Sequence, residues 1–269
     1  LLSLKKTLAD PDRDIKIKAI ELLSKVKNKE AIEILSGFLR DKDEKIKETS
    51  LYALGNIGTN AVIHPLSEGL KDKSTNIRLC TIENLGKIKD DSVIKFLSVG
   101  LKDKSFQVKN KAIDILAERK EETALEVLFP LIKDESFDIR LKIVHILGVK
   151  GNEEVVPYLT KALKDNYSNL RLSAVNALGL IGTESAVDGL ITALKDTKEE
   201  VVLTVIRILG ELGNEKAILP LIELSKQNRK SIQKEIILAL GKIGNEEAFP
   251  ALNQILLFGS KDLRKVTQD

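Results

Sequence analysis

The stretch ALGLIGTESAVDGLITALKD, Ala177 to Asp196, decides the fold because a near-copy of it, ALGNIGTNAVIHPLSEGLKD, occupies Ala53 to Asp72. The aspartate that closes each copy belongs to a series with a constant step of 31 residues. The series contains Asp10, Asp41, Asp72, Asp103, Asp134, Asp165 and Asp196, and the same step then reaches Gln227 and Phe258. A fixed period of this length is typical of proteins built from stacked repeats.

Other positions of the repeat keep the same step from these anchor positions. A basic residue lies six positions after each of the first six anchors. The basic series is Lys16, Lys47, Arg78, Lys109, Arg140 and Arg171, after which Val202 and Gln233 interrupt it. Leu is always found thirteen positions after the anchor, and it is usually followed by Gly. The offset of a residue is its distance in sequence from the anchor of its own repeat.

Each repeat is predicted to form two short antiparallel helices. Between Asp134 and Asp165, in DESFDIRLKIVHILGVKGNEEVVPYLTKALKD, apolar residues such as Ile139 and Ile143 recur at helical spacing. Gly151 is expected to end the first helix in a left-handed conformation, and Asn152 is expected to cap the second. Two helices of about 12 residues, roughly 18 Å each, fit within a repeat. The helix after the anchor is the inner helix, and the one before it is the outer helix.

One such hairpin cannot bury its apolar face, whereas stacked hairpins can. We therefore predict an all-α protein, a right-handed α-solenoid of about eight to nine helical hairpins in a single domain covering residues 1–269. Eight inner helices should be complete, with an outer helix at about 1–9 and a partial inner helix near 261–269. The sequence begins without Met and has no polar capping repeat, so we expect it to be a piece of a longer array.

A short signature identifies the type of repeat. The pattern D-x4-[VI]-R-x6-LG-x-IG is seen as DNYSNLRLSAVNALGLIG at 165–182 and as DKDEKIKETSLYALGNIG at 41–58. It resembles the short HEAT-like repeats of the phycobilisome-lyase (PBS lyase) type, and the resemblance covers essentially the whole chain. The family spans lyases, hydroxylases, adaptors and chaperones, so the resemblance indicates the fold much more specifically than the function.

The resemblance implies a ladder of ion pairs between neighbouring repeats that fixes their register. The implied members are Asp41, Asp72, Asp103, Asp134, Asp165, Lys47, Arg78, Lys109, Arg140 and Arg171. If these pairs are exposed, each contributes only about 0–1 kcal/mol to stability. The ladder is interrupted at Val202, Gln227 and Gln233. We therefore expect a looser or differently curved stack near residues 196–235.

The composition argues against several kinds of chemistry. Some HEAT-like proteins are di-iron hydroxylases with paired His-Glu motifs, but the two histidines of this chain, His64 and His145, are not followed by Glu. Others excise damaged bases with a Trp in a basic groove, whereas this chain has no Trp and a net charge of only +3. We predict no metal, no cofactor and no catalytic residues. Nucleic-acid binding is disfavoured, although a nucleic-acid scaffold is kept as an alternative.

The sequence also bears on the compartment. Cys80 is the single cysteine, so no intrachain disulfide forms, and a reducing compartment is compatible with this. No apolar run reaches the roughly 18 residues that a membrane span requires. We predict a cytoplasmic location, and leave open a signal peptide before the first residue of this sequence.

The inner helices are expected to line the concave side of the solenoid, where a partner would bind. In the middle repeats, positions not needed for the core are apolar or aromatic instead of polar. The candidate contacts are Tyr52, Leu79, Phe106, Phe137, Leu141, His145, Leu172 and Leu203. They predict a continuous apolar strip over four or five repeats, which could receive a helix or an extended segment of another protein. Alternatively, the leucines pack into the seam between inner helices.

The sequence therefore predicts a non-catalytic scaffold or adaptor that binds a protein or peptide. A lyase-type or chaperone subunit that assists cofactor attachment is the alternative from another class.

Overall fold

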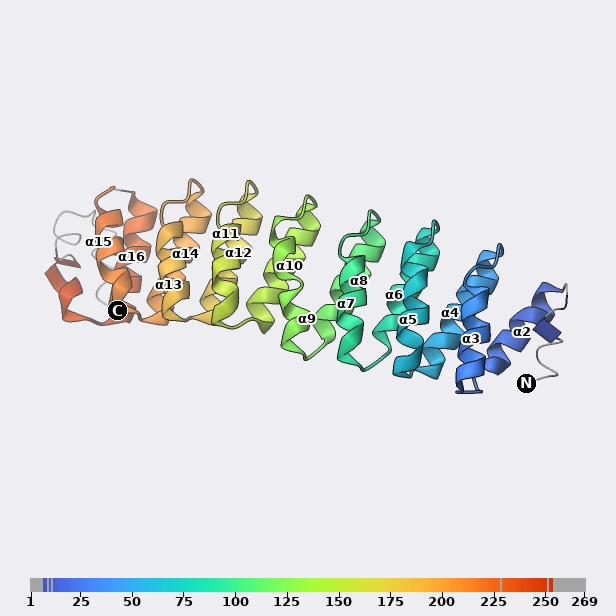
Figure 1. The fold of residues 1–269 in the computed structure, drawn as a ribbon. Helices are drawn as coiled ribbons and strands as arrows, with labels where there is room; N and C mark the ends of the chain where they lie inside the picture. Colours follow the sequence, from blue (N-terminus) through green and yellow to red (C-terminus); the bar gives the residue numbers. More distant parts are fainter. Residues whose placement is uncertain (1–6, 9, 11, 228, 251, 254–269) are drawn as a thin grey trace. The chain divides into compact units, whose positions relative to one another are not determined.

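The computed structural model describes residues 7–8, 10, 12–227, 229–250 and 252–253, and it consists of helices joined by short loops (Figure 1). The chain divides into two compact units, residues 1–128 and 129–269. The prediction of a single domain over the whole chain stays a prediction. The predicted helices at about 1–9 and 261–269 fall mainly or wholly outside the described residues.

The first unit contains four inner helices and the outer segments between them. The inner helices are α2 (Arg13–Leu23), α4 (Glu44–Ile57), α6 (Thr75–Gly86) and α8 (Phe106–Glu118). The outer helices are α3 (Lys29–Phe38), α5 (Ile63–Ser67), α7 (Ile94–Gly100) and α9 (Glu122–Glu126). Short 3-10 segments are η1 (Asn60–Val62), η2 (Glu68–Lys71) and η3 (Asp91–Val93).

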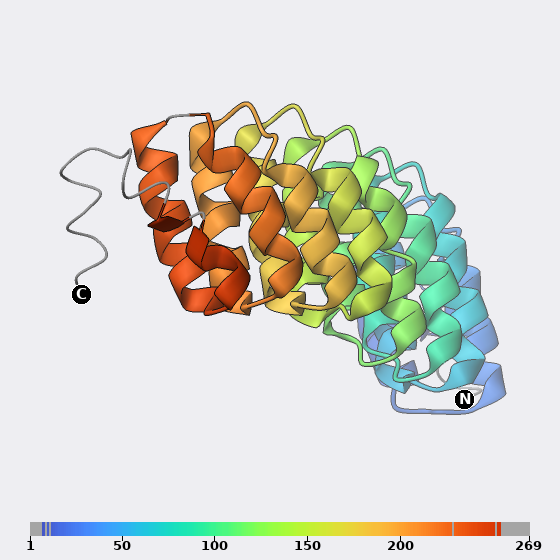
Figure 2. The same cartoon turned by 90° about the vertical axis from the view of Figure 1, so that its left-hand side faces the viewer.

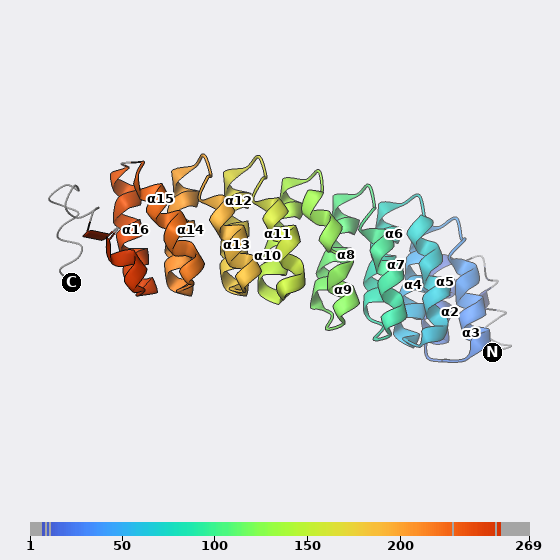
Figure 3. The same cartoon turned by 60° about the vertical axis from the view of Figure 1, so that its left-hand side comes forward.

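The second unit repeats this organisation. Its inner helices are α10 (Phe137–Lys150), α12 (Ser168–Ile181), α14 (Glu199–Leu212) and α16 (Lys230–Ile243). Its outer helices are α11 (Val156–Ala162), α13 (Glu184–Ala193) and α15 (Ile218–Ser225). The 3-10 segments are η4 (Phe129–Lys133), η5 (Glu153–Val155), η6 (Glu215–Ala217) and η7 (Glu246–Ala248). Figures 1 and 3 show α12, α14 and α16 side by side, and Figure 2 shows the inner and outer helices of this unit as two layers.

The prediction of an α-solenoid is confirmed, and the eight predicted inner helices all lie within the described residues. The Leu at offset thirteen explains the stacking, because it is completely or almost completely buried in every repeat. These residues are Leu23, Leu54, Leu85, Leu116, Leu147, Leu178, Leu209 and Leu240. Burying one such side chain stabilises the fold by about 2 kcal/mol.

The outer helices are shorter than the predicted 12 residues, and most begin with a 3-10 turn. Proline contributes to this in α5, α11 and α15, because it has no N–H group and is tolerated only in the first turn of an α-helix. Pro65, Pro157 and Pro220 lie two, one and two residues after the first residues of α5, α11 and α15. The chain before each proline forms the 3-10 segment.

The glycine at offset fourteen lets neighbouring inner helices approach closely. A Cβ added at Gly148 would lie 2.6 Å from Cβ of Ala177, and one at Gly210 would lie 2.7 Å from Cα of Ala239. These contacts are too short for any side chain, so glycine is required there by the close packing of helix on helix.

One prediction about a helix end was wrong. Gly151 has extended backbone angles, φ −78° and ψ 162°, so it does not end α10 in a left-handed conformation. Gly182 does adopt that conformation after α12, with φ 63°. The prediction for Asn152 was right, because its side chain accepts a hydrogen bond from the N–H of Glu154.

Candidate partner-binding surface

Four of the ladder pairs implied by the family resemblance form, two inside each unit. In the first unit, Nζ of Lys47 lies 2.6 Å from Oδ2 of Asp72. In the same unit, Arg78 donates two hydrogen bonds to Asp103, from Nε at 2.6 Å and from Nη2 at 3.0 Å. The second unit has the pairs Arg140–Asp165 and Arg171–Asp196, with Nε to Oδ2 distances of 2.7 and 2.6 Å.

The pairs are buried, and this increases the loss of stability expected when one partner is removed. The side chains of Arg78 and Asp103 are only 6% and 10% exposed. The remaining Nη1 of Arg78 donates to the carbonyl oxygens of Asp72 and Lys73 in its own loop. Because a bonded arginine stabilises the carboxylate, Arg78 holds the pKa of Asp103 below its usual value, and Arg171 does the same for Asp196. The contribution of about 0–1 kcal/mol given for exposed ion pairs therefore does not apply. Removing one partner would leave the other charge buried without a counter-charge.

The inner face of a unit is the surface formed by the residues at offsets seven, eleven and fifteen of its inner helices. These three offsets are four residues apart, so they share one side of a helix. In the second unit, α10 contributes Leu141, His145 and Val149 to this face, and the adjacent α12 contributes Leu172, Asn176 and Leu180.

Exposure on this inner face increases along each helix. Leu141 and Leu172, at offset seven, are half-buried, and His145 is exposed. Val149 is 61% exposed and Leu180 is 72% exposed. The leucines at offset seven therefore lie partly in the seam between helices, while the side chains at offset fifteen face solvent.

The apolar patch of the second unit ends at α14. Leu203 is half-buried, but the next two positions on the same face are Arg207 and Glu211. Both make ion pairs with α16: Nε of Arg207 lies 3.2 Å from Oε1 of Glu235, and Oε1 of Glu211 lies 3.6 Å from Nζ of Lys242. The patch is thus confined to α10, α12 and the start of α14.

Phe137 is half-buried because it packs against another ring. Its ring centroid lies 4.8 Å from that of Tyr167, which is 56% exposed, and the guanidinium of Arg140 lies 5.9 Å from the Tyr167 ring. Phe137 is the first residue of α10, and Tyr167 is the residue immediately before α12. Tyr167 was missed by the sequence analysis, although it stands at offset two, where most repeats carry Asp or Ser.

The inner face of the first unit is mixed. Tyr52 is 37% exposed, with Nζ of Lys87 5.0 Å from its ring centroid. Leu79 is half-buried, and Phe106 is 51% exposed at the start of α8.

The three inner-face positions of α8 are polar: Asn110, Asp114 and Glu118. The predicted continuous apolar strip stays a prediction, because α8 has an amide and two carboxylates at these three positions but also carries the exposed Phe106 at offset three.

Comparison with known proteins identifies the repeat. A family model described as HEAT repeats matches residues 1–79, 63–141, 125–204 and 187–267. The chain belongs to the HEAT-repeat family. The HEAT-like repeat predicted from the sequence is thereby confirmed.

Solved structures resemble this HEAT-repeat chain at low identity. A Kap121p mutant is 13% identical, with a TM-score of 0.58 over 98% of this chain and 36% of Kap121p, which supports the solenoid fold. The complex of CpcE and CpcF of phycocyanin lyase from Nostoc sp. PCC7120 is 17% identical, with a TM-score of 0.40 over 82% of this chain and 92% of that one. Human deoxyhypusine hydroxylase is 21% identical, with a TM-score of 0.41 over 90% and 94%. A search of curated protein sequences returns no match.

The structure offers this HEAT-repeat chain no evident centre for metal or thiol chemistry among the described residues. Across the described residues, no group of three or more His, Cys, Asp or Glu side chains is placed to hold a metal ion. In the same part of the chain, no helix is long and apolar enough to cross a membrane. Burial raises the pKa of the Cys80 thiol to about 11, which opposes formation of the thiolate needed for nucleophilic chemistry.

Proposed function

We propose that this HEAT-repeat protein is a non-catalytic scaffold that binds a protein or peptide through the inner face of its second unit. The observation that carries the proposal is the residue type at offset fifteen. Six of the eight inner helices have a charged or amide residue there, and only the adjacent α10 and α12 have an aliphatic one, Val149 and Leu180. Two exposed aliphatic residues on neighbouring helices form an apolar patch, and its exposure to water is unfavourable.

The spacing of the patch indicates what it binds. Neighbouring helices lie about 10 Å apart, which matches seven residues of a helix rising about 1.5 Å per residue. A partner helix that crosses α10 and α12 would place apolar residues seven positions apart against Val149 and Leu180. Residues three or four positions away would reach His145 and Asn176. The expected partner is therefore an amphipathic helix of another protein.

Rigid presentation explains how a small patch could suffice. The buried ladder pair Arg140–Asp165 ties α10 to the anchor loop that precedes α12, and Arg171–Asp196 ties α12 to the one that precedes α14. Little conformational entropy is then lost from the scaffold when the partner binds. Each aliphatic side chain that becomes fully buried contributes about 1.5–3 kcal/mol.

The test is partner capture from a lysate of the source organism with three proteins: the parent chain, the double variant Val149→Lys/Leu180→Lys, and the control Leu219→Lys. Leu219, on the outer helix α15, is 72% exposed, the same as Leu180, so the control adds a lysine at an equally exposed site of another surface. We expect a partner that the parent and the control retain and the double variant loses. Equal retention by all three would reject the inner face as the binding surface.

The non-catalytic part of the proposal has its own readout. The captured partner is incubated with the parent chain, and its intact mass is compared before and after. We expect no change in mass. A covalent change that depends on the parent chain would contradict the proposal and favour the alternative of a cofactor-attachment subunit.

A further inference from the structure

A pocket opens in the second unit where the ladder is interrupted. At the intact pair, Nε and Nη2 of Arg171 bind the carboxylate of Asp196, while Nη1 donates to the carbonyl oxygens of Asp165 and Asn166. One repeat later, the basic residue is replaced by Val202, which is 1% exposed, and the next anchor is Gln227, which is exposed. Both members of this pair are therefore missing.

The pocket at the interrupted pair is larger than the pocket at an intact pair. At the intact pair of the same unit, Arg140 itself lines a pocket of about 320 Å³ between the ends of η4 and α11. At the corresponding place between the ends of α13 and α15, the pocket is about 630 Å³. This volume lies within the range of small-molecule sites.

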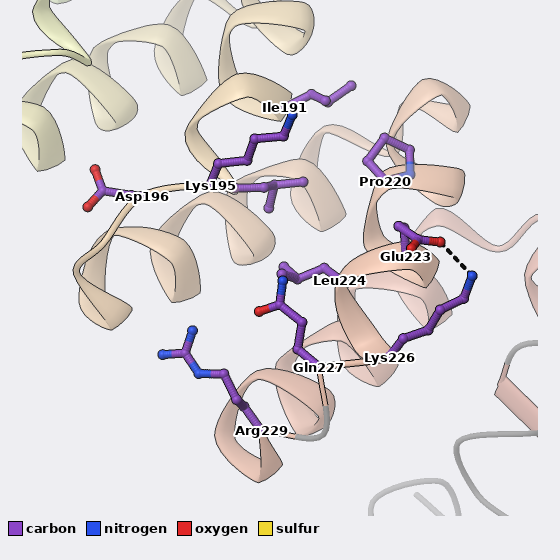
Figure 4. A pocket seen from close by; sticks show the side chains of 10 residues that line it. Ile191, Lys195, Asp196, Pro220, Glu223, Leu224, Lys226, Gln227 and Arg229 are labelled. Atoms are coloured by element: carbon purple, nitrogen blue, oxygen red, sulfur yellow. Dashed lines mark hydrogen bonds and ion pairs between the residues drawn. The ribbon is translucent and has the colours of Figure 1, made fainter.

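The walls combine an apolar floor with a polar rim (Figure 4). Ile191 and Leu194 from α13 and its end, with Pro220 and Leu224 from α15, supply the apolar surface. The polar residues are Lys195, Asp196, Glu223, Lys226, Gln227 and Arg229. Figure 4 shows Lys195 beside Ile191 on one wall, and Glu223 with Lys226 on the opposite wall.

The charges of the rim are mostly compensated. Asp196 is held by Arg171, and Lys226 forms an ion pair with Glu223 at 2.5 Å. Arg229 forms an ion pair with Glu199 at 2.7 Å. Over the described residues, Lys195 has no ion pair and the Gln227 side chain has no hydrogen bond. The unused groups are thus an ammonium and an amide that can donate, both suited to an anion above an apolar floor.

We propose that this pocket binds a carboxylate carried on an aliphatic chain. The carboxylate would accept hydrogen bonds from Lys195 and Gln227, and the aliphatic part would lie against Leu194 and Leu224. Two sources have this chemistry: the C-terminus of a peptide that ends in an aliphatic residue, and a free medium-chain carboxylic acid. The pocket lies at the ends of α13 and α15 and uses no inner-face residue, so the proposal does not depend on the proposed function.

The test is titration of the full chain with small probes, followed by NMR of the methyl groups of Leu194 and Leu224 and of the side-chain amide of Gln227. The probes are octanoate and the peptide acetyl-Gly-Gly-Leu with a free carboxyl group. Octanamide and the amidated peptide are their uncharged controls. We expect the carboxylates to shift these signals with at least tenfold tighter binding than the amides, as a charge-assisted hydrogen bond requires. Binding of only the peptide acid, or only octanoate, supports the proposal and identifies the source.

Two variants locate the binding in the pocket. The double variant Val202→Arg/Gln227→Asp rebuilds the ladder pair found in the preceding repeats, so it should fold, fill the pocket and abolish carboxylate binding. Lys195→Met should weaken binding about tenfold, whereas Lys164→Met, at the same offset beside an intact pair, should leave it unchanged.

Three results would overturn the proposal: no shift with either carboxylate, equal binding of octanamide and octanoate, or full octanoate binding by Val202→Arg/Gln227→Asp. If that double variant fails to fold, the comparison of Lys195→Met with Lys164→Met decides alone.

Discussion

Two glycines at the same offset should respond in opposite ways to the same substitution. A Cβ added at Gly210 in α14 would lie 2.7 Å from Cα and 2.8 Å from Cβ of Ala239 in α16. Among the described residues, a Cβ added at Gly241 in α16 would meet nothing within 4 Å. The substitutions Gly210→Ala and Gly241→Ala therefore change helix propensity equally but differ in packing.

The magnitude follows from two terms. Replacing glycine by alanine inside a helix stabilises it by about 1 kcal/mol. Ordinary carbon contacts are about 3.5–4.0 Å, so the new methyl at Gly210 overlaps the backbone of α16 by about 1 Å. Backbone cannot rotate away as a side chain can, so the overpacking cost should lie at the upper end of its usual range, about 3 kcal/mol. We expect Gly210→Ala to be about 2 kcal/mol less stable than the parent, and Gly241→Ala to be about 1 kcal/mol more stable.

The assay is urea unfolding followed by far-ultraviolet circular dichroism, with hydrogen exchange of α14 and α16 as a local readout in case the repeats do not unfold together. The double variant Gly210→Ala/Ala239→Gly removes one of the clashing atoms but leaves Cα of residue 239 in place, so it should recover only part of the lost stability. If Gly210→Ala proved as stable as Gly241→Ala, the close approach of α14 to α16 would be refuted.

Two further predictions concern buried polar groups. Because the folded pKa values of Asp103 and Asp196 lie below the ordinary value of 3.8, their stabilising effect should be complete above about pH 5 and lost as the pH falls through the folded values. Asp103→Asn should lower the free energy of unfolding by about 3 kcal/mol at neutral pH, because it leaves Arg78 buried without its partner. It should also make the free energy of unfolding depend less on pH in the acid range, as measured by urea unfolding at several pH values. An unchanged pH dependence would contradict this. Cys80 should react with a disulfide reagent at pH 8 about 100-fold more slowly in the folded than in the unfolded chain, since its thiol pKa is about 11 instead of 9.0, and similar rates would refute its burial.

The inner helices could be predicted from the sequence because the residues that build them are periodic. The Leu at offset thirteen and the anchor aspartate recur without insertion, so all eight inner helices could be placed. The outer helices were predicted less well. Their prolines act locally, by removing an N–H donor, and a count of apolar residues does not register that effect. The left-handed end predicted for Gly151 failed for a related reason, since the backbone there is extended and a glycine is compatible with either conformation.

The candidate surface was harder to predict, because exposure depends on the distance between neighbouring inner helices. Leu141 and Leu172 are half-buried, and α10 and α12 approach closely where Gly148 packs on Ala177. The sequence likewise left open whether the ladder pairs are exposed, and the structure shows that Arg78 and Asp103 are buried. In contrast, the sequence alone predicts a polar inner face for α8, because Asn110, Asp114 and Glu118 occupy offsets seven, eleven and fifteen.

Residues that differ from the repeat pattern are most informative where the change would be expected to lower the stability of the fold. Losing only Arg or only Asp from a ladder pair would leave a buried charge without its partner, at a cost of about 3–5 kcal/mol. At Val202 and Gln227 both charges are absent together, and Gln233 instead donates a hydrogen bond to the carbonyl oxygen of Ser225. Because both charges are absent, no buried charge is left without a partner. A pocket is found where the preceding repeats have a guanidinium. The aliphatic residues at offset fifteen are a different case from Val202 and Gln227. Val149 and Leu180 are exposed, so they contribute little to the stacking of the repeats. Stacking of the repeats therefore requires neither departure, and the two proposed binding sites would account for both.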